Sequence, residues 1–272
     1  MKTLPYDAAL YASQRSAELL PGPDAVDGRA VAQYLDRGFI AVANLLTAEE
    51  IERYTRLVED LSGGRVESYN RVQEDRGVQL DAKSFDSDRV RKLWFTPDES
   101  RRFGLPVDHP VIGGVVAQLM EERTPALYQA MALLKPPHGG GEKPWHQDHA
   151  YFNVPLGQRI VGVWLALDPA TVANGCLHLI PGEHKDGAIP HFVRRDWQIC
   201  DTDILGKESV AAELPPGAAL FFDGLAPHGT PVNDSNQRRR AMQFHYAPQD
   251  APDWTDDQRT AVFGSEGRDV YC

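Results

Sequence analysis

Residues 126–135, ALYQAMALLK, begin the part of the chain whose pattern decides the fold. This run is uncharged up to its last position, and it ends at Pro136-Pro137 and the glycines that follow. Further short apolar runs come after it, separated by turn-prone residues. The runs are residues 126–135, 145–154, 160–167, 176–181, 210–214, 218–223, 228–232 and 240–246. Short strands at this spacing, with helices gathered upstream, predict a mainly β protein with a jelly-roll core.

The region upstream of these strands predicts flanking helices. Residues 27–37 carry apolar side chains at helical spacing, and residues 39–42 then read as a short strand. Thr47 stands three positions before Glu50, which is the capping-box pattern, so a helix is expected to begin there. Another short helix is expected at residues 111–120.

The whole chain, residues 1–272, is interpreted as one domain. Its expected parts are a helical N-terminal part at about 1–125, a double-stranded β-helix of the cupin-like type at about 126–248 and a C-terminal tail at 249–272. The charged stretch 65–106 is expected to be irregular, with Trp94 and Phe95 as its anchors in the core.

The composition argues against several classes of partner. The formal net charge is −11, so neither nucleic acid nor an anionic membrane is expected to bind. The three cysteines, Cys176, Cys200 and Cys272, lie far apart and form no CxxC pair, which favours a reducing compartment. No apolar run approaches the about 20 residues of a membrane helix, and the N-terminal residues lack a signal-peptide core. We expect a cytoplasmic protein that binds a small molecule; the sequence makes no prediction of its oligomeric state.

The segment Pro144-Trp145-His146-Gln147-Asp148-His149 contains a candidate metal-binding pair. If the segment is a strand, His146 and Asp148 point to the same face because side chains alternate along a strand. Two histidines and one carboxylate form the facial triad of non-haem iron enzymes, which leaves three coordination positions open for a bidentate 2-oxo acid and O2. A His-x-Asp pair alone is a weak signal, since most such pairs are exposed polar residues.

A second histidine is needed to complete the triad. His228 is the preferred candidate because it follows the apolar run Ala219-Leu220-Phe221-Phe222 and a turn at Asp223-Gly224. The competing histidines are His178, His184, His191 and His245. The residues that follow His228 favour it further.

Arg239 lies eleven positions after His228, beyond the turn-prone residues 233–236. If that turn closes a symmetric hairpin, Thr230 lies opposite Arg239 and shares a strand face with His228. A guanidinium and a hydroxyl placed together would bind a carboxylate, such as the distal one of 2-oxoglutarate. The alternative is that residues 238–240, all arginine, form a solvated basic run; the spacing from His228 favours the binding site.

With these motifs in place, the chain from about residue 27 to residue 248 resembles the phytanoyl-CoA dioxygenase (PhyH) family of Fe(II)/2-oxoglutarate-dependent oxygenases. The resemblance rests on Gly38-Phe39-Ile40, the helix start Leu46-Thr47-Ala48-Glu49-Glu50, Leu134-Lys135-Pro136-Pro137, Trp145-His146-Gln147-Asp148, residues 175–185, and Pro227-His228-Gly229-Thr230 with Arg239. The iron ligands that it implies are His146, Asp148 and His228. The residues that would bind the tail of 2-oxoglutarate are Arg239 and Thr230.

The resemblance extends to two further positions. Trp164 matches a residue that lines the 2-oxoglutarate pocket in some relatives, with ordinary core packing as an equal alternative. Gln129 matches a residue that faces the active site in ectoine hydroxylase, and a solvent-facing strand position is at least as good an interpretation. One departure is that residues 182–184 are Gly-Glu-His where the family usually has Gly-Ser-His.

These residues imply a dioxygenase that uses Fe(II), 2-oxoglutarate and O2 to hydroxylate a C–H bond of a small molecule, releasing succinate and CO2. Asp148 favours hydroxylation over halogenation, since related halogenases have a small residue at that position. The alternatives are a Zn(II) cupin-like hydrolase and a non-catalytic metabolite-binding barrel. The side chains expected to line the substrate pocket are Trp145, Tyr151, Phe152, Gln243 and His245. Trp197, within the unassigned segment 183–209, is a candidate for a lid.

Overall fold

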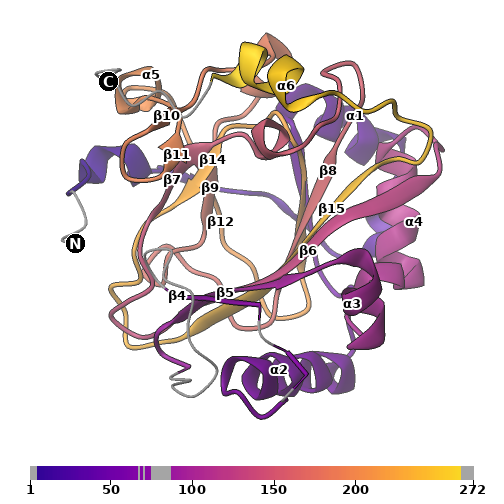
Figure 1. Cartoon of the computed structure of the whole chain (residues 1–272), viewed down its shortest axis with the longest axis vertical. Coiled ribbons are helices and arrows are strands. Elements are labelled where there is room, and N and C mark those ends of the chain that lie inside the picture. Colours follow the sequence, from indigo (N-terminus) through magenta and orange to yellow (C-terminus); the bar gives the residue numbers. More distant parts are fainter. Residues whose placement is uncertain (1–4, 67, 70, 75–86, 265–272) are drawn as a thin grey trace.

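Two β-sheets face each other, and helices pack on the outer face of the larger sheet (Figure 1). The computed structural model describes residues 5–66, 68–69, 71–74 and 87–264. The larger sheet has the strand order β2 (Leu19–Leu20), β3 (Phe39–Val42), β13 (Ala219–Asp223), β8 (Val161–Ala166), β15 (Arg239–Pro248), β6 (Pro125–Lys135), β5 (Val90–Phe95) and β4 (Val72–Glu74). The smaller sheet has the order β1 (Arg15–Ser16), β12 (Val210–Ala212), β9 (Leu177–Leu179), β14 (His228–Thr230) and β7 (Lys143–His146). The prediction of a jelly roll with flanking helices is confirmed.

The remaining elements are short. The helices are α1 (Gly28–Arg37), α2 (Ala48–Ser62), α3 (Pro97–Arg102), α4 (Pro110–Leu119), α5 (Asp201–Ile204) and α6 (Asp256–Phe263). Single 3-10 turns are η1 (Ala8–Tyr11), η2 (Pro23–Ala25), η3 (Pro106–Asp108), η4 (Asp148–Tyr151) and η5 (Glu183–Asp186), and β10 (Phe192–Val193) pairs with β11 (Trp197–Gln198). Helix α2 begins with the predicted capping box between Thr47 and Glu50. Within the described residues, no helix combines the length and apolar character that crossing a membrane requires.

Strand β3 shows how the apolar side chains divide into two layers. Phe39 and Ala41 point into the space between the two sheets, where they pack with Leu220. Ile40 and Val42, the residues between and after them, point outward to the layer beneath the helices. This alternation follows from the two-residue period of a strand. All four side chains of β3 are buried, as is usual for a strand that is covered on both faces.

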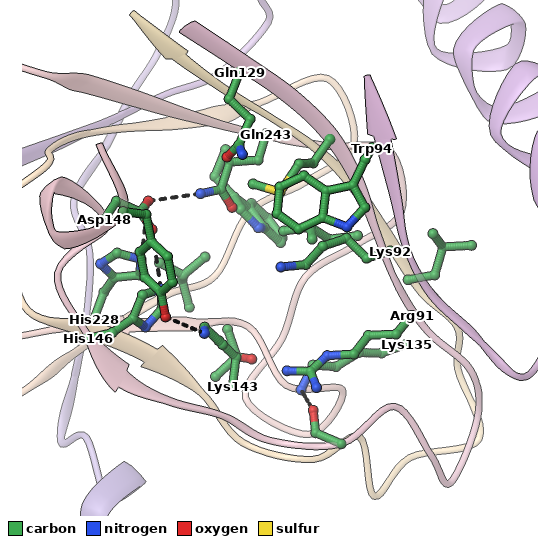
Figure 2. A pocket seen from close by; sticks show the side chains of 18 of the residues that line it. Arg91, Lys92, Trp94, Gln129, Lys135, Lys143, His146, Asp148, His228 and Gln243 are labelled. Atoms are coloured by element: carbon green, nitrogen blue, oxygen red, sulfur yellow. Dashed lines mark hydrogen bonds and ion pairs between the residues drawn. The ribbon is translucent and has the colours of Figure 1, made fainter. Parts of the chain in front are cut away.

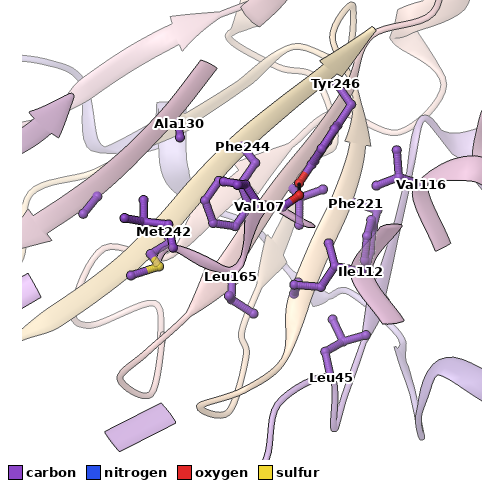
Figure 3. Close-up of a cluster of buried hydrophobic side chains, with 14 of the residues drawn as sticks. Leu45, Val107, Ile112, Val116, Ala130, Leu165, Phe221, Met242, Phe244 and Tyr246 are labelled. Atoms are coloured by element: carbon purple, nitrogen blue, oxygen red, sulfur yellow. Dashed lines mark hydrogen bonds between the residues drawn. The ribbon is translucent and has the colours of Figure 1, made fainter. Parts of the chain in front are cut away.

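The layer beneath the helices holds strand β15 in place (Figure 3). Met242, Phe244 and Tyr246 of β15 point into this layer, and the hydroxyl of Tyr246 donates a hydrogen bond of 2.7 Å to the carbonyl of Val107. Because side chains alternate along the strand, the residues between them face the interior of the jelly roll. The apolar layer therefore fixes the position of a strand whose other face is polar.

The expectation of an irregular segment at residues 65–106 is wrong for its second half. Strand β5 lies there and pairs with β6, and β4 pairs with β5 in turn. Phe95 is buried in the apolar layer, as expected, whereas Trp94 faces the interior of the jelly roll. The sequence pattern does not indicate strand β5, because its inward positions carry charged residues, including Lys92, instead of apolar ones. The structure also forms helix α6 in the tail that the sequence left unassigned.

A close contact at Gly162 leads to a stability prediction. A Cβ atom on this residue of β8 would lie 2.4 Å from Cζ of Phe222, whose ring is 4.8 Å from the ring of His228. We expect Gly162→Ala to lower the free energy of unfolding by about 1–3 kcal/mol through overpacking, measured by urea denaturation. The matched control is Gly113→Ala in α4, where nothing lies within 4 Å of the new Cβ and a gain of roughly 0.5–1 kcal/mol is expected. Equal urea midpoints for Gly162→Ala and the unsubstituted protein would contradict the close contact between residue 162 and the ring of Phe222.

Candidate active site

His146 and His228 lie directly opposite each other on the paired strands β7 and β14. Their ring centroids are 4.2 Å apart. Asp148 follows as the first residue of the 3-10 turn η4, and one ligand atom from each of the three residues falls within 4.8 Å of the others. Strand β7 ends at His146, so the prediction of one strand over residues 145–154 is wrong. The turn, rather than strand alternation, brings the carboxylate to the two imidazoles.

Both imidazoles are held with the same nitrogen facing the candidate metal site. Nδ1 of His146 lies 2.8 Å from the carbonyl of Pro144, and Nδ1 of His228 lies 2.9 Å from that of Ala226. A carbonyl can only accept, so each Nδ1 carries the proton and each Nε2 keeps its lone pair. Burial lowers the pKa of both rings, that of His146 to about 3 with a further contribution from His228. Neutral imidazoles are the form that binds a metal ion.

The carboxylate of Asp148 is held by two side chains of β15. Its Oδ2 accepts hydrogen bonds from Nε2 of Gln243 at 2.9 Å and from Nε2 of His245 at 2.7 Å. Its Oδ1 lies 3.2 Å from Nε2 of His146. Burial by itself would raise the pKa of Asp148, but the neighbouring imidazoles of His228 and His245 hold it well below its usual range. Asp148 is therefore an ionised carboxylate whose Oδ2 is held by β15, 3.5 Å from Nε2 of His228, and whose Oδ1 is turned toward His146.

The competing histidines occupy other positions. Nδ1 of His178 lies 2.7 Å from the hydroxyl of Ser13, on the far side of β9. Nε2 of His184 lies 3.1 Å from the carbonyl of Leu35. Nε2 of His191 accepts a hydrogen bond from the backbone N–H of Gln147. These three histidines do not line the cavity beside Asp148, and His245 lies behind the carboxylate, so the geometry leaves His228 as the third residue.

Thr230 and Arg239 do not form the predicted hairpin. Strand β14 pairs with β7 and β9 in the smaller sheet, whereas β15 pairs with β6 and β8 in the larger one. Residues 231–238 therefore connect the two sheets instead of closing a turn between neighbouring strands. The two side chains nevertheless line the same cavity, from opposite sheets. Trp164 and Gln129, the other predicted residues, line it as well.

The guanidinium of Arg239 is buried with unused donors. The residue is 2% exposed, and its one hydrogen bond to the described residues runs from Nη2 to the carbonyl of Gly175 at 3.3 Å. Its Nε and Nη1 have no hydrogen-bond partner within the described part of the chain, and neither has Nε1 of Trp164. The guanidinium lies over the ring of Trp164, 5.2 Å from its centroid. Burial lowers the pKa of Arg239 to about 10. Buried donors of this kind are nearly always satisfied in proteins, so the arrangement favours an anionic ligand.

The expected substrate pocket is partly reproduced. Tyr151, Phe152 and Gln243 line the cavity. Trp145 does not, because it precedes His146 on β7 and points to the other face, where its indole N–H donates to the carbonyl of Leu10. Trp197 is not among the lining residues either, although its ring packs edge-on against Tyr151 at 5.0 Å.

Several residues of the cavity were not predicted (Figure 2). Arg91, Lys92 and Trp94 reach it from β5, and Lys143 reaches it from the start of β7. Gln147, between the two candidate ligands, points away and donates hydrogen bonds to the carbonyls of Gly187 and Leu225, in two other segments of the chain. Charged residues in a stretch without clear alternation resemble a protein surface, so only the strand pairing reveals that they face inward.

The sequence model of the phytanoyl-CoA dioxygenase (PhyH) family matches residues 34–241. Phytanoyl-CoA dioxygenase domain-containing protein 1 of Danio rerio is 34% identical over 149 residues, which are 52% of this chain and 51% of the relative. A probable phytanoyl-CoA dioxygenase of Caenorhabditis elegans is 26% identical over 238 residues, covering 80% of this chain and 74% of the relative. The chain spans about half the length of the first curated relatives that it matches.

Solved structures share the fold over most of the chain. EvdO2 from Micromonospora carbonacea var. aurantiaca, complexed with 2-oxoglutarate, has a TM-score of 0.65 and 25% identity, covering 85% of this chain and 94% of EvdO2. EctD from S. alaskensis, with 2-oxoglutarate and 5-hydroxyectoine, has a TM-score of 0.65 and 18% identity, covering 90% of this chain and 82% of EctD. The family match extends from α1 to the beginning of β15 and includes every residue of the His–Asp–His group. The chain therefore belongs to the phytanoyl-CoA dioxygenase (PhyH) family.

Proposed function

We propose that this protein is an Fe(II)- and 2-oxoglutarate-dependent oxygenase that hydroxylates an unactivated C–H bond of a small-molecule metabolite. The observation that carries the proposal is the pairing of two features in one cavity. His146, Asp148 and His228 lie on one side of it, and the buried, unsatisfied guanidinium of Arg239 lies in the same lining. A dicarboxylate that reaches from a metal ion to Arg239 would occupy both.

The residues that line the cavity fit both Fe(II) and 2-oxoglutarate. Two neutral imidazoles and one carboxylate are the donor set of the iron facial triad, and Asp148 supplies the ionised oxygen. The distal carboxylate of 2-oxoglutarate would give Arg239 the acceptor that it lacks, with the hydroxyl of Thr230 nearby. The other end of the cosubstrate would then reach the metal ion that His146, Asp148 and His228 would hold.

Bound Fe(II), 2-oxoglutarate and O2 would supply the oxidation, in which one oxygen atom enters the substrate as a hydroxyl and the other enters succinate as CO2 is lost. The chain's own residues bind and orient the reactants. Gln243 and His245 hold Asp148, and the ring of Phe222 packs 4.8 Å from that of His228. No side chain is required as a general base. The presence of Asp148, which would be the carboxylate ligand, supports hydroxylation rather than halogenation.

The alternative functions do not account for Arg239. A zinc hydrolase needs the metal ion and a water molecule, and it has no use for a buried guanidinium in the same cavity. A non-catalytic barrel has no need for the His–Asp–His group. A small-molecule substrate remains our expectation, with no nucleic acid or membrane as partner.

The proposal is tested by anaerobic titration of the metal-free protein with Fe(II) and then with 2-oxoglutarate. We expect a visible charge-transfer band from the chelated 2-oxo acid, followed on exposure to O2 by release of succinate. The same titration with Zn(II) is the control and should give no band. Binding of Fe(II) without a band upon addition of 2-oxoglutarate would contradict the proposed function and favour the zinc hydrolase.

The hydrogen bonds from β15 to Asp148 lead to a second prediction for this site. His245→Ala is expected to weaken Fe(II) binding by about 10- to 100-fold, because partners that orient a metal ligand contribute on this scale. The variant removes the 2.7 Å hydrogen bond and lets Asp148 turn. Fe(II) affinity is measured by competition with a chelator, and His184→Ala, which alters a histidine outside the cavity, is the control. Unchanged affinity in His245→Ala would show that the position of Asp148 does not depend on this bond.

A further inference from the structure

The turn at residues 224–226, which lies between β13 and β14, is bonded to several parts of the candidate metal site. Its first carbonyl accepts a hydrogen bond of 2.9 Å from the backbone N–H of His149. Its second accepts one of 2.7 Å from the side-chain amide of Gln147, and its third accepts one of 2.9 Å from Nδ1 of His228. The residues on both sides of Asp148 are therefore tied to the same turn that orients an imidazole of the site.

The turn itself is firmly held. The backbone N–H of Gly224 donates to the carbonyl of Ile160 at 2.8 Å. Those of Leu225 and Ala226 donate to the side chain and to the carbonyl of Asp223. A Cβ atom on Gly224 would lie 2.9 Å from Cβ of Ile160, so the backbone packs closely here. All six backbone polar groups of the turn are thus paired, which makes it a fixed support.

The whole side-chain amide of Gln147 is used in this arrangement. Its Nε2 donates to the carbonyls of Leu225 and Gly187, and its Oε1 accepts from the backbone N–H of Ile189. Two carbonyls can only accept and a backbone N–H can only donate, so the orientation of the amide is determined. The residue is fully buried, and its own backbone N–H donates to Nε2 of His191 at 2.9 Å. One side chain therefore joins the segment before Asp148 to two other segments.

Strand pairing fixes only part of the candidate metal site. The ladder between β7 and β14 places His146 opposite His228, but β7 ends at His146, so the backbone of Asp148 lies outside that ladder. The hydrogen bonds from β15 hold one oxygen of the carboxylate and not the backbone. The backbone of Asp148 is instead held by the bonds that its neighbours on either side make to the turn at 224–226.

We propose that Gln147 is a positioning residue of the metal site, which sets the separation between Asp148 and His228 through the turn at 224–226. That separation is 3.5 Å between Oδ2 of Asp148 and Nε2 of His228. This inference rests on the proposed function, in which these two residues and His146 bind Fe(II). Because the hydrogen bonds of Gln147 are made within the protein, the ligands are brought together when the chain folds, and the metal affinity should depend on them.

The test replaces the amide by an apolar side chain of similar length. Gln147→Met is expected to weaken the binding of Fe(II) and of Co(II) by about 10- to 100-fold, measured anaerobically by chelator competition. The visible absorption spectrum of bound Co(II) should change as well, since it depends on the number and arrangement of the ligands. Urea denaturation of the metal-free proteins records stability separately.

Gln198→Met is the matched control. Gln198 is also fully buried, and its side chain likewise makes three hydrogen bonds, with the backbones of Arg195 and Ile199 and the carboxylate of Asp201. None of these bonds reaches the turn at 224–226. The control should therefore lose stability in urea as Gln147→Met does, but keep the metal affinity and the Co(II) spectrum of the unsubstituted protein.

Two results with the variants would overturn the role of Gln147. One is a metal affinity and a Co(II) spectrum in Gln147→Met that match those of the unsubstituted protein. The other is an equal loss of metal affinity in both glutamine variants, since the effect would then follow from stability alone. If Gln147→Met does not fold, hydrogen exchange in the metal-free unsubstituted protein decides. The side-chain amide protons of Gln147 and the backbone amide of His149 should exchange as slowly as the amides of β13, and rapid exchange would overturn the proposal.

The outcomes also separate this inference from the proposed function. The metal-binding comparison uses neither 2-oxoglutarate nor O2. If the unsubstituted protein binds Fe(II) but gives no charge-transfer band with 2-oxoglutarate, the proposed function fails, and the comparison of Gln147→Met with Gln198→Met still decides the role of Gln147. If the unsubstituted protein binds neither Fe(II) nor Co(II), both proposals are wrong.

Discussion

Asp148→Ala is expected to weaken Fe(II) binding by more than about 100-fold and to abolish succinate release. Residues that merely orient a metal ligand contribute about 10- to 100-fold, so removal of a ligand should exceed that range. The substitution also leaves the donors of Gln243 and His245 without their acceptor, at a cost of about 1–3 kcal/mol each. Affinity is measured by chelator competition, and succinate by its release under O2.

Two further variants make the result for Asp148 interpretable. Asp148→Asn preserves the shape of the side chain, and it should stay folded while losing most of the metal affinity. Asp36→Ala removes an exposed carboxylate that pairs with Lys185, and it should leave both measurements unchanged. Metal binding and turnover that survive in Asp148→Asn and Asp148→Ala would exclude this residue as a ligand.

Arg239→Met is expected to weaken 2-oxoglutarate binding by roughly 100-fold while Fe(II) still binds. The two lost charge-assisted hydrogen bonds are worth about 1.5–3 kcal/mol each before the partial compensation by Thr230, and 1.4 kcal/mol is a factor of ten. The measurement is the concentration of 2-oxoglutarate that half-saturates the charge-transfer band. In the ligand-free protein the substitution should also raise the free energy of unfolding, because it removes a buried cation without a counterion.

The neighbouring arginine offers a matched control. Arg240 points to the other face of β15, where it pairs with Asp168 and with Glu59. Arg240→Met should therefore lower stability without changing the affinity for 2-oxoglutarate, the reverse of the pattern expected for Arg239→Met. If both variants bind the cosubstrate like the unsubstituted protein, the carboxylate is held elsewhere in the cavity.

The residues of the candidate site differ in how far the sequence could predict them. His146 and Asp148 are two positions apart, so their proximity is a local property of the chain and hardly depends on whether a strand or a turn joins them. The relation of Thr230 to Arg239 depends on which strands pair, and the assumption of a hairpin was wrong. The two residues lie in different sheets.

Local patterns were enough to predict the jelly-roll class, the capped helix α2 and the His–Asp–His group, because strand and helix periods and turn residues act over a few positions. The folded arrangement of the strands was needed to show that Gln243 and His245 hold Asp148, since these residues are more than 90 positions from it in the chain. It also decided that Lys92 faces the cavity, through the pairing of β5 with β6. A charged side chain on a strand can face solvent or a cavity with the same local pattern, and only the neighbouring strand distinguishes the two.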